Sequence, residues 1–356
     1  MDIVFEKARQ LEPHNVDIMT MYAQYLRNSS RHEKALQLYQ MAREFSPLSI
    51  SVLYGLARIY EAAGEYENAL DLYAKIRQVD PASSVGYGPA SGPYMLMGDI
   101  AQAQYWLFQA IAVDPNDSDL SNWVVWTSID LGDFDSARQW LGWVERTQNL
   151  NPMTMTNRSI LSVYESDTEL AMSYARQMIE GQMQDRWGSD STAARILLLW
   201  ALDQGQTNIS LDLARQAHPE LFTPSPAVDA TNVLQAIDFA HLLKLEEKVV
   251  DAEILLRAVI TIYDQPYAAT EIWQVSGKAQ ALAQLGDKQA ALNELRHQVD
   301  KGMRLSWRWQ TELNPNFKPL WEDPEFQAIV EFLRSDMARQ LEEIKAMQAA
   351  GEIPSA

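Results

Sequence analysis

The sequence predicts an all-α solenoid built from antiparallel helix pairs, and two observations point to it. Prolines recur at a fixed step of 34 residues, at Pro13, Pro47, Pro81 and Pro115. The composition is 47% hydrophobic and 22% charged over 356 residues, as expected of a globular chain. A fixed step of this length indicates stacked units, which lengthen a chain without enlarging a single core.

Each unit reads as two helices joined by a tight turn and ended by the proline. Glycines stand in the turns at Gly64, Gly98 and Gly132, where a left-handed backbone angle is required. Alanine at the tightest crossing lets the helices approach closely, and larger residues fill the groove beside it. The proline ends the second helix and begins the next unit. The matching positions are Phe5, Ala8 and Pro13; Ala35, Tyr39, Ala42 and Pro47; Ala69, Tyr73, Ile76 and Pro81; and Ala103, Leu107, Ala110 and Pro115.

These residues resemble the tetratricopeptide repeat (TPR), whose fold is a right-handed superhelix. The resemblance is close over residues 5–147 and continues through degenerate repeats over 152–302, so 1–302 is predicted to be a TPR array. Repeats after the first are expected to stack because one helix pair cannot bury its own apolar face. The later repeats are placed at about 118–151, 152–190, 191–232, 233–271 and 272–302.

The N-terminal end of the array looks incomplete. Only a second helix, Phe5 to about Leu11, precedes Pro13, and no first helix covers it. Solenoids need capping elements at their ends. The chain is therefore expected to begin inside a larger protein.

The C-terminal end looks closed. Residues 314–328 resemble a segment that ends TPR arrays in bacterial winged-helix regulators and adenylate-cyclase-type signalling proteins. Asp323 is suited to cap a helix, with Pro324 at its first position and Phe326 packing inward. Residues 303–356 are therefore predicted to form a C-terminal loop and a capping helix.

One stretch conflicts with a regular repeat. Helix-breaking glycines and prolines cluster where the first helix of the third repeat pair is expected. Each proline or glycine in the interior of a helix destabilises it. The sequence therefore predicts a helix that starts late, near Ser91, after a glycine-rich loop. Two interpretations remain open, namely drift in a repeat held by its neighbours, or a notch in the concave face. The breakers are Gly86, Gly88, Pro89, Gly92 and Pro93.

The TPR resemblance implies a concave groove lined by side chains of the first helices. A clamp for a C-terminal carboxylate needs Lys, Asn and Arg at several of these positions, and only three loosely fit, so a chaperone-adaptor role is not supported. Aromatic residues with one or two arginines instead suit an extended peptide or a partner helix. A solvated inner face without a partner is the alternative. The candidate partner-binding residues are Arg27, Tyr54, Arg58, Asn122, Trp123 and Trp126.

Signals for catalysis, metals and cofactors are missing from the sequence. The chain has no cysteine, and its five histidines do not occur at metal-ligand spacing. Residues 114–119 imitate a calcium loop, but Asp119 stands where glycine is required and Val125 where glutamate is required. No nucleophile elbow or phosphate-binding loop occurs. We expect no enzymatic activity, no catalytic residue, no metal and no cofactor.

Charge limits the partners. The net charge of −19 disfavours nucleic acid and anionic lipid, and no apolar run approaches the roughly 20 residues that span a bilayer. The predicted function is a non-catalytic scaffold that binds a peptide or partner protein, without nucleic-acid binding or membrane insertion by this segment. The alternative is the sensor or regulatory portion of a larger bacterial signalling or transcription-regulatory protein. A cytoplasmic location is favoured, and a periplasmic one if the parent is a membrane-tethered regulator.

Overall fold

The computed structural model describes residues 1–29, 31–147, 151–181, 189–264 and 276–354. Over these ranges the chain forms α-helices and short 3₁₀ turns and no strand, so the predicted all-α solenoid class is confirmed. Contacts between residues divide the chain into two compact units, each described by itself. Unit 1 comprises Met1–Leu120 with Met347–Pro354, and unit 2 comprises Ser121–Ala346.

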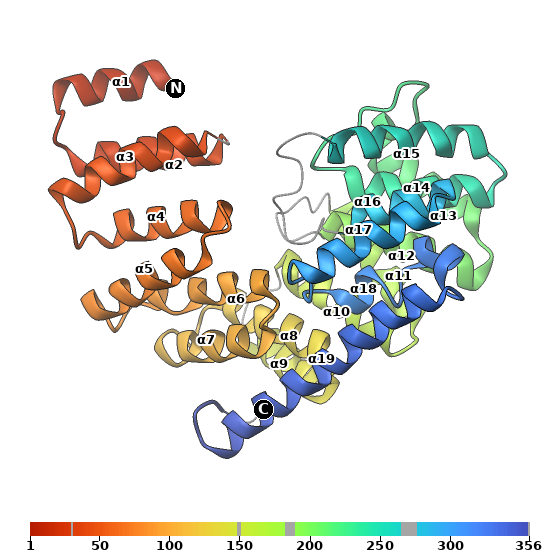
Figure 1. Cartoon of the computed structure of the whole chain (residues 1–356). Helices are drawn as coiled ribbons and strands as arrows, with labels where there is room; N and C mark the ends of the chain where they lie inside the picture. Colours follow the sequence, from red (N-terminus) through yellow and green to blue (C-terminus); the bar gives the residue numbers. More distant parts are fainter. Residues whose placement is uncertain (30, 148–150, 182–188, 265–275, 355–356) are drawn as a thin grey trace. The chain divides into compact units, whose positions relative to one another are not determined.

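Unit 1 is a stack of helix pairs in which each pair packs on the next (Figure 1). We call the first helix of a pair its A helix and the second its B helix. The A helices are α2, α4 and α6, the B helices are α3, α5 and α7, and α1 precedes the first pair. The elements are α1 (Asp2–Leu11), α2 (Val16–Asn28), α3 (His32–Phe45), α4 (Ile50–Ala62), α5 (Tyr66–Val79), η1 (Ser84–Gly86), η2 (Gly88–Ala90), α6 (Ser91–Met97) and α7 (Ile100–Val113).

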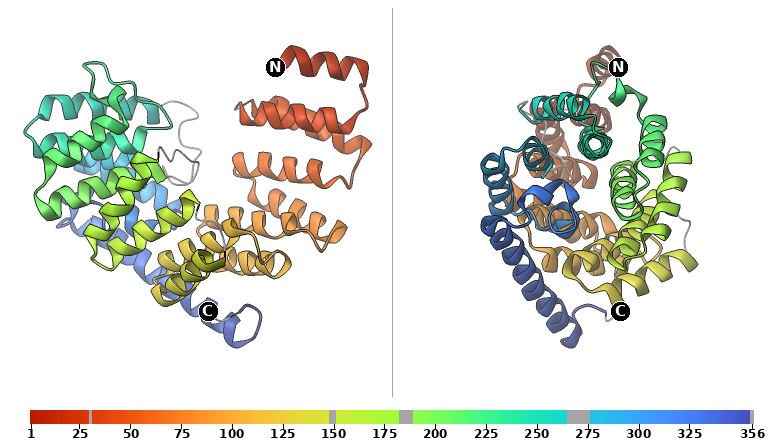
Figure 2. Two further views of the ribbon diagram at one scale, coloured as in Figure 1. Left: turned by 180° about the vertical axis from the view of Figure 1, so that it is seen from behind. Right: turned by 90° about the vertical axis from the view of Figure 1, so that its right-hand side faces the viewer.

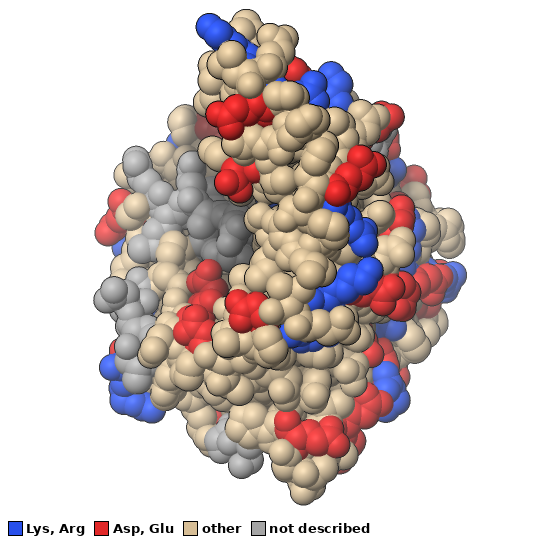
Figure 3. All heavy atoms as spheres, turned by 90° about the vertical axis from the view of Figure 1, so that its left-hand side faces the viewer, with Lys and Arg blue, Asp and Glu red and all other residues tan. Residues whose placement is uncertain are grey.

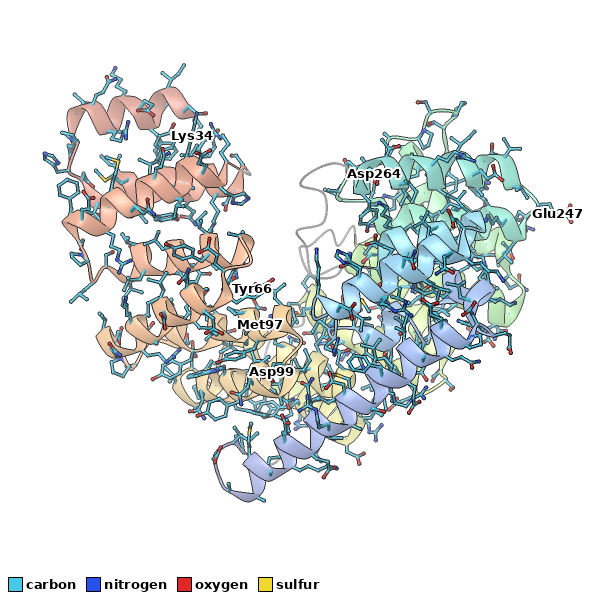
Figure 4. All side chains as sticks on the ribbon, in the orientation of Figure 1. Lys34, Tyr66, Met97, Asp99, Glu247 and Asp264 are labelled. Carbon is cyan, nitrogen blue, oxygen red and sulfur yellow. The ribbon has the colours of Figure 1, made fainter. Side chains whose placement is uncertain are left out.

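The repeat residues act as the sequence predicts. Gly64, Gly98 and Gly132 have left-handed φ angles of 77°, 82° and 81°. After the second of these turns, Asp99, labelled in Figure 4, begins α7 by accepting a hydrogen bond from the Gln102 backbone N–H at 2.9 Å. The alanines at the predicted crossings have no exposed surface, and these are Ala35, Ala69, Ala103 and Ala137.

The late-starting helix is also confirmed. α6 begins at Ser91, after the two 3₁₀ turns η1 and η2, and it runs only to Met97. This start places Pro93 in the first turn of the helix. Backbone N–H groups in the first turn have no acceptor within the helix, so proline there loses no helical hydrogen bond. The breakers therefore shorten one A helix.

Close packing explains two of the glycines in that stretch. A Cβ atom at Gly86 would lie 2.7 Å from Arg77 Cγ and 3.0 Å from the Arg77 backbone nitrogen. One at Gly88 would lie 2.7 Å from Leu120 Cδ2. Neither position has room for a side chain unless its neighbours move, so drift is not needed to account for these two residues.

Unit 2 contains the remaining helix pairs, and the bounds given above for the degenerate repeats stay a prediction. Its A helices are α8, α10, α12, α14 and α16. None of the helices in the described part of the chain is both long and apolar enough to cross a membrane. The elements are α8 (Ser118–Leu131, in unit 2 from Ser121), α9 (Phe134–Thr147), α10 (Pro152–Tyr164), α11 (Thr168–Glu180), α12 (Ser189–Gln204), α13 (Thr207–Ala217), η3 (Pro219–Phe222), α14 (Val233–Leu245), α15 (Val249–Tyr263), α16 (Gly277–Leu285) and α17 (Lys288–Asp300).

The chain then forms α18 (Trp307–Gln310), η5 (Pro315–Leu320) and the long helix α19 (Pro324–Ala349). Asp323 caps α19 as predicted, since its Oδ1 accepts a hydrogen bond from the Glu325 backbone N–H at 2.9 Å. Phe326 is buried, and its ring centroid lies 5.4 Å from that of Phe317. A division of the chain at residue 302 into array and cap stays a prediction.

Candidate functional site

The predicted partner-binding residues belong to different units. Arg27, Tyr54 and Arg58 lie in unit 1, on α2 and α4. Asn122, Trp123 and Trp126 lie on α8, in unit 2. The two groups are therefore described separately.

An ion pair on α4 forms the centre of the first group. The Arg58 guanidinium contacts the Glu61 carboxylate one turn later, and the Tyr73 hydroxyl donates to Glu61 Oε1 at 2.6 Å. The two partners differ in exposure, since the Arg58 side chain is 43% exposed and that of Glu61 only 5%. Burial raises the pKa of the Glu61 carboxyl, although Arg58 and the Tyr73 hydrogen bond act in the opposite direction. Arg58 thus keeps its carboxylate partner beneath it while part of its own surface faces solvent.

Neighbouring A helices contribute to the same place. Arg27, on α2, is close enough to lower the pKa of Glu61 electrostatically. The Tyr54 ring centroid lies 6.4 Å from that of Tyr73. On α6, a Cβ atom at Gly92 would lie 3.8 Å from both Glu61 carboxylate oxygens and 3.9 Å from Arg58 Nη1. We call Arg27, Tyr54, Arg58, Glu61 and Tyr73 the unit 1 cluster.

The unit 1 cluster carries two cations and one carboxylate in a chain whose net charge is −19. Figure 3 shows acidic and basic side chains interspersed over the face that it draws, without a large patch of either sign. The cluster therefore carries a local excess of positive charge. This charge suits a partner with a carboxylate and apolar or aromatic side chains. Tyr73 was not predicted as a site residue, because it lies on a B helix at a core position of the repeat.

The predicted binding residues on α8 contact other residues of unit 2. Asn122 has no exposed surface, and its Nδ2 donates to Thr154 Oγ1 at 3.0 Å. Trp126 is 6% exposed, and its Nε1 donates to Ser306 Oγ at 2.9 Å. Trp123 is half-buried, with its ring centroid 5.8 Å from that of Trp126.

Ser306, the hydrogen-bond partner of Trp126, belongs to what we call the C-terminal segment, residues 303–320. Figure 2 shows this segment, in blue, among the helices of unit 2. Its Trp307 and Phe317 side chains are 1% and 0% exposed. The segment therefore forms part of the core of unit 2.

Polar side chains from three successive A helices of unit 2 hold the C-terminal segment. Arg195 on α12 donates from Nη1 to the Trp309 carbonyl at 3.1 Å. Asn316 Nδ2 donates to Asp238 Oδ1 on α14 at 2.6 Å and to Gln280 Oε1 on α16 at 3.1 Å. This network was not predicted, although Arg195 and Asp238 each stand within an apolar stretch of the sequence, which was a visible signal for it.

Arg195 and Asp238 also form a buried ion pair. Arg195 Nε lies 2.8 Å from Asp238 Oδ1, and the two side chains are 5% and 1% exposed. Burial raises the pKa of Asp238, while Arg195 and Asn316 favour its ionised form. A charged pair this deeply buried depends on the surrounding hydrogen bonds for compensation.

Residues 114–119, whose sequence resembles the start of a calcium loop, contain a helix cap in the structure. Asp117 Oδ1 accepts hydrogen bonds from the backbone N–H groups of Asp119 at 2.9 Å and Leu120 at 3.3 Å. Over the described ranges, no group of three or more His, Cys, Asp or Glu side chains is arranged to hold a metal ion.

Comparison with known proteins concerns the fold. No family model matches the chain. No curated protein matches it either. A tetratricopeptide repeat protein from Parabacteroides merdae is similar in structure, with a TM-score of 0.50 and 16% identity, over 68% of this chain and 90% of that one. The APC/C hetero-tetramer Cut9–Hcn1 is similar with a TM-score of 0.51 and 12% identity, over 90% of this chain and 56% of that one. At these identities the likeness shows the fold, an all-α helical solenoid of the tetratricopeptide repeat type.

Proposed function

We propose that the chain is a non-catalytic protein-interaction module that binds a peptide or partner helix on the A helices of unit 1, over the unit 1 cluster. The supporting observation is the exposure of Arg58 above a buried carboxylate that fixes its position. Stacked helix pairs offer an extended face for such a partner. The proposal leaves out Asn122 and Trp126, because their polar groups already have partners inside unit 2.

The chemistry of the unit 1 cluster favours a partner that carries a carboxylate beside an apolar or aromatic side chain. Arg58 retains donors for a second carboxylate, since a guanidinium offers five N–H groups. Tyr54, half-buried beside it, supplies a rigid aromatic surface of the kind found at binding hot spots.

Selection of peptides from a random displayed library on the full chain tests the proposal. Selected peptides should lose affinity about tenfold or more with Arg58→Ser, as expected for a hot-spot arginine. Arg43→Ser is the matched control, since it removes the same charge from α3, a B helix. Equal affinity of the parent and Arg58→Ser for every selected peptide would refute the proposed site.

The alternative, the regulatory portion of a larger bacterial signalling protein, stays a prediction. Nothing in the described residues favours it over an independent interaction module. The sequence of the full-length gene product would separate the two.

A further inference from the structure

Asp130, on α8, holds the start of the C-terminal segment. Its Oδ2 accepts a hydrogen bond from the Ser306 backbone N–H at 2.8 Å, and its carbonyl accepts one from Trp307 Nε1 at 2.8 Å. Ser306 has a left-handed φ of 56°, which is uncommon for a residue other than glycine. This backbone conformation therefore depends on the contacts that surround it.

The other carboxylate oxygen of Asp130 faces a different environment. Oδ1 is buried and, within the described part of the chain, has no hydrogen-bond partner. Asn157 Oδ1 is also buried without a hydrogen-bond partner among the described residues. Asp130 and Asn157 line one small cavity together with Tyr164 and Ser306. Asn157 cannot supply a hydrogen by reversing its amide, because its Nδ2 already donates to the Asn122 carbonyl and to Asn122 Oδ1, both at 3.0 Å.

The Tyr164 hydroxyl in the same cavity, also without a partner among the described residues, can donate one hydrogen to one of these acceptors, and a buried acceptor left without a hydrogen is unfavourable. A protonated carboxyl supplies such a hydrogen and still accepts the Ser306 N–H through its second oxygen. Burial also raises the pKa of Asp130 well above its ordinary value.

The groups that face Asp130 compensate its charge only in part. Arg308, on the C-terminal segment, favours the ionised form. Its guanidinium, however, lies over the Trp307 ring, and its Nε is 3.6 Å from the Glu312 carboxylate. The Tyr164 hydroxyl on α10 is itself buried, and burial raises its pKa, so it is neutral in the same pH range.

We propose that Asp130 is a proton-dependent latch that holds the C-terminal segment on the A helices of unit 2 while it is protonated and releases it as the proton is lost. Release would expose Trp126 and the neighbouring surface of α8 and α10 to solvent. The latch lies in unit 2, so it does not rest on the function proposed for unit 1.

Hydrogen exchange of the full chain, followed by mass spectrometry and corrected for the intrinsic pH dependence of exchange, tests the latch. The opening constant of residues 303–320 should rise with pH above the ordinary carboxyl pKa, by up to about tenfold per pH unit, and should level off once the pH exceeds the raised pKa of buried Asp130. Asp130→Asn keeps an acceptor for Ser306 and has no proton to lose, so its opening constant should stay flat. Glu312→Gln is the control for a nearby acid and should keep the pH dependence of the parent.

Two results would overturn the latch. A flat opening constant in the parent chain excludes it without any variant, even if Asp130→Asn fails to fold. An equal pH dependence in the parent and in Asp130→Asn assigns the opening to another group.

Discussion

Replacing Arg195 by methionine removes the cation from the buried pair in unit 2. Arg195 also donates from Nη1 to the Trp309 carbonyl and from Nη2 to Gln280 Oε1 at 2.9 Å. Three hydrogen bonds are lost, and Asp238 is left 1% exposed without its counter-ion.

Removal of one partner from a buried ion pair costs about 3–5 kcal/mol, because the remaining charge is uncompensated. For a unit the size of unit 2, each kcal/mol lowers the melting temperature by about 2–4 °C. We therefore expect Arg195→Met to lower the melting temperature of unit 2 by about 6–20 °C.

Thermal unfolding followed by circular dichroism measures this loss, and hydrogen exchange assigns the affected transition to unit 2. The double variant Arg195→Met with Asp238→Leu removes both charges, so it should be less destabilised than the single variant. A single variant that melts within about 1 °C of the parent would refute the account of the network. A double variant less stable than the single one would contradict it as well.

Three further outcomes are expected. Ala69→Leu and Ala103→Leu should each lower the free energy of unfolding of unit 1 by about 1–3 kcal/mol in urea titrations, because both crossings are fully buried; parental stability in both would show that the repeat register is wrong. Gly86→Ala should destabilise unit 1 because its Cβ would meet the Arg77 backbone, whereas Gly92→Ala, which has room, should stabilise it by about 0.4–1 kcal/mol. If both changes destabilise equally, packing does not explain the stretch. Glu61→Gln should flatten the pH dependence of unit 1 stability. The folded state raises the pKa of the Glu61 carboxyl, so this group adds stability at low pH. That stability is lost as the pH rises from the unfolded-state pKa through the folded-state pKa. Unchanged slopes of urea midpoint against pH would contradict this assignment.

The sequence predicts those parts of the fold that local chemistry determines. A 34-residue step of prolines, alanines and turn glycines specifies each helix pair, and the breakers at residues 86–93 specify the late start of α6. These features depend on neighbours within a few residues or one repeat along the chain.

Features that depend on distant parts of the chain are not visible in the repeat pattern. Trp126 reads as a groove residue, yet its partner is Ser306, 180 positions later. Nothing in the local sequence specifies such a partner. The binding role of Arg27, Tyr54 and Arg58 stays a prediction.

We propose above that partners bind the A helices of unit 1. Hydrogen exchange of the full chain with and without a selected peptide tests it most directly. Exchange should be slower with the peptide in α2, α4 and α6, with no change in α10, α12 and α14. Protection confined to the unit 2 helices, or to the B helices of unit 1, would contradict it.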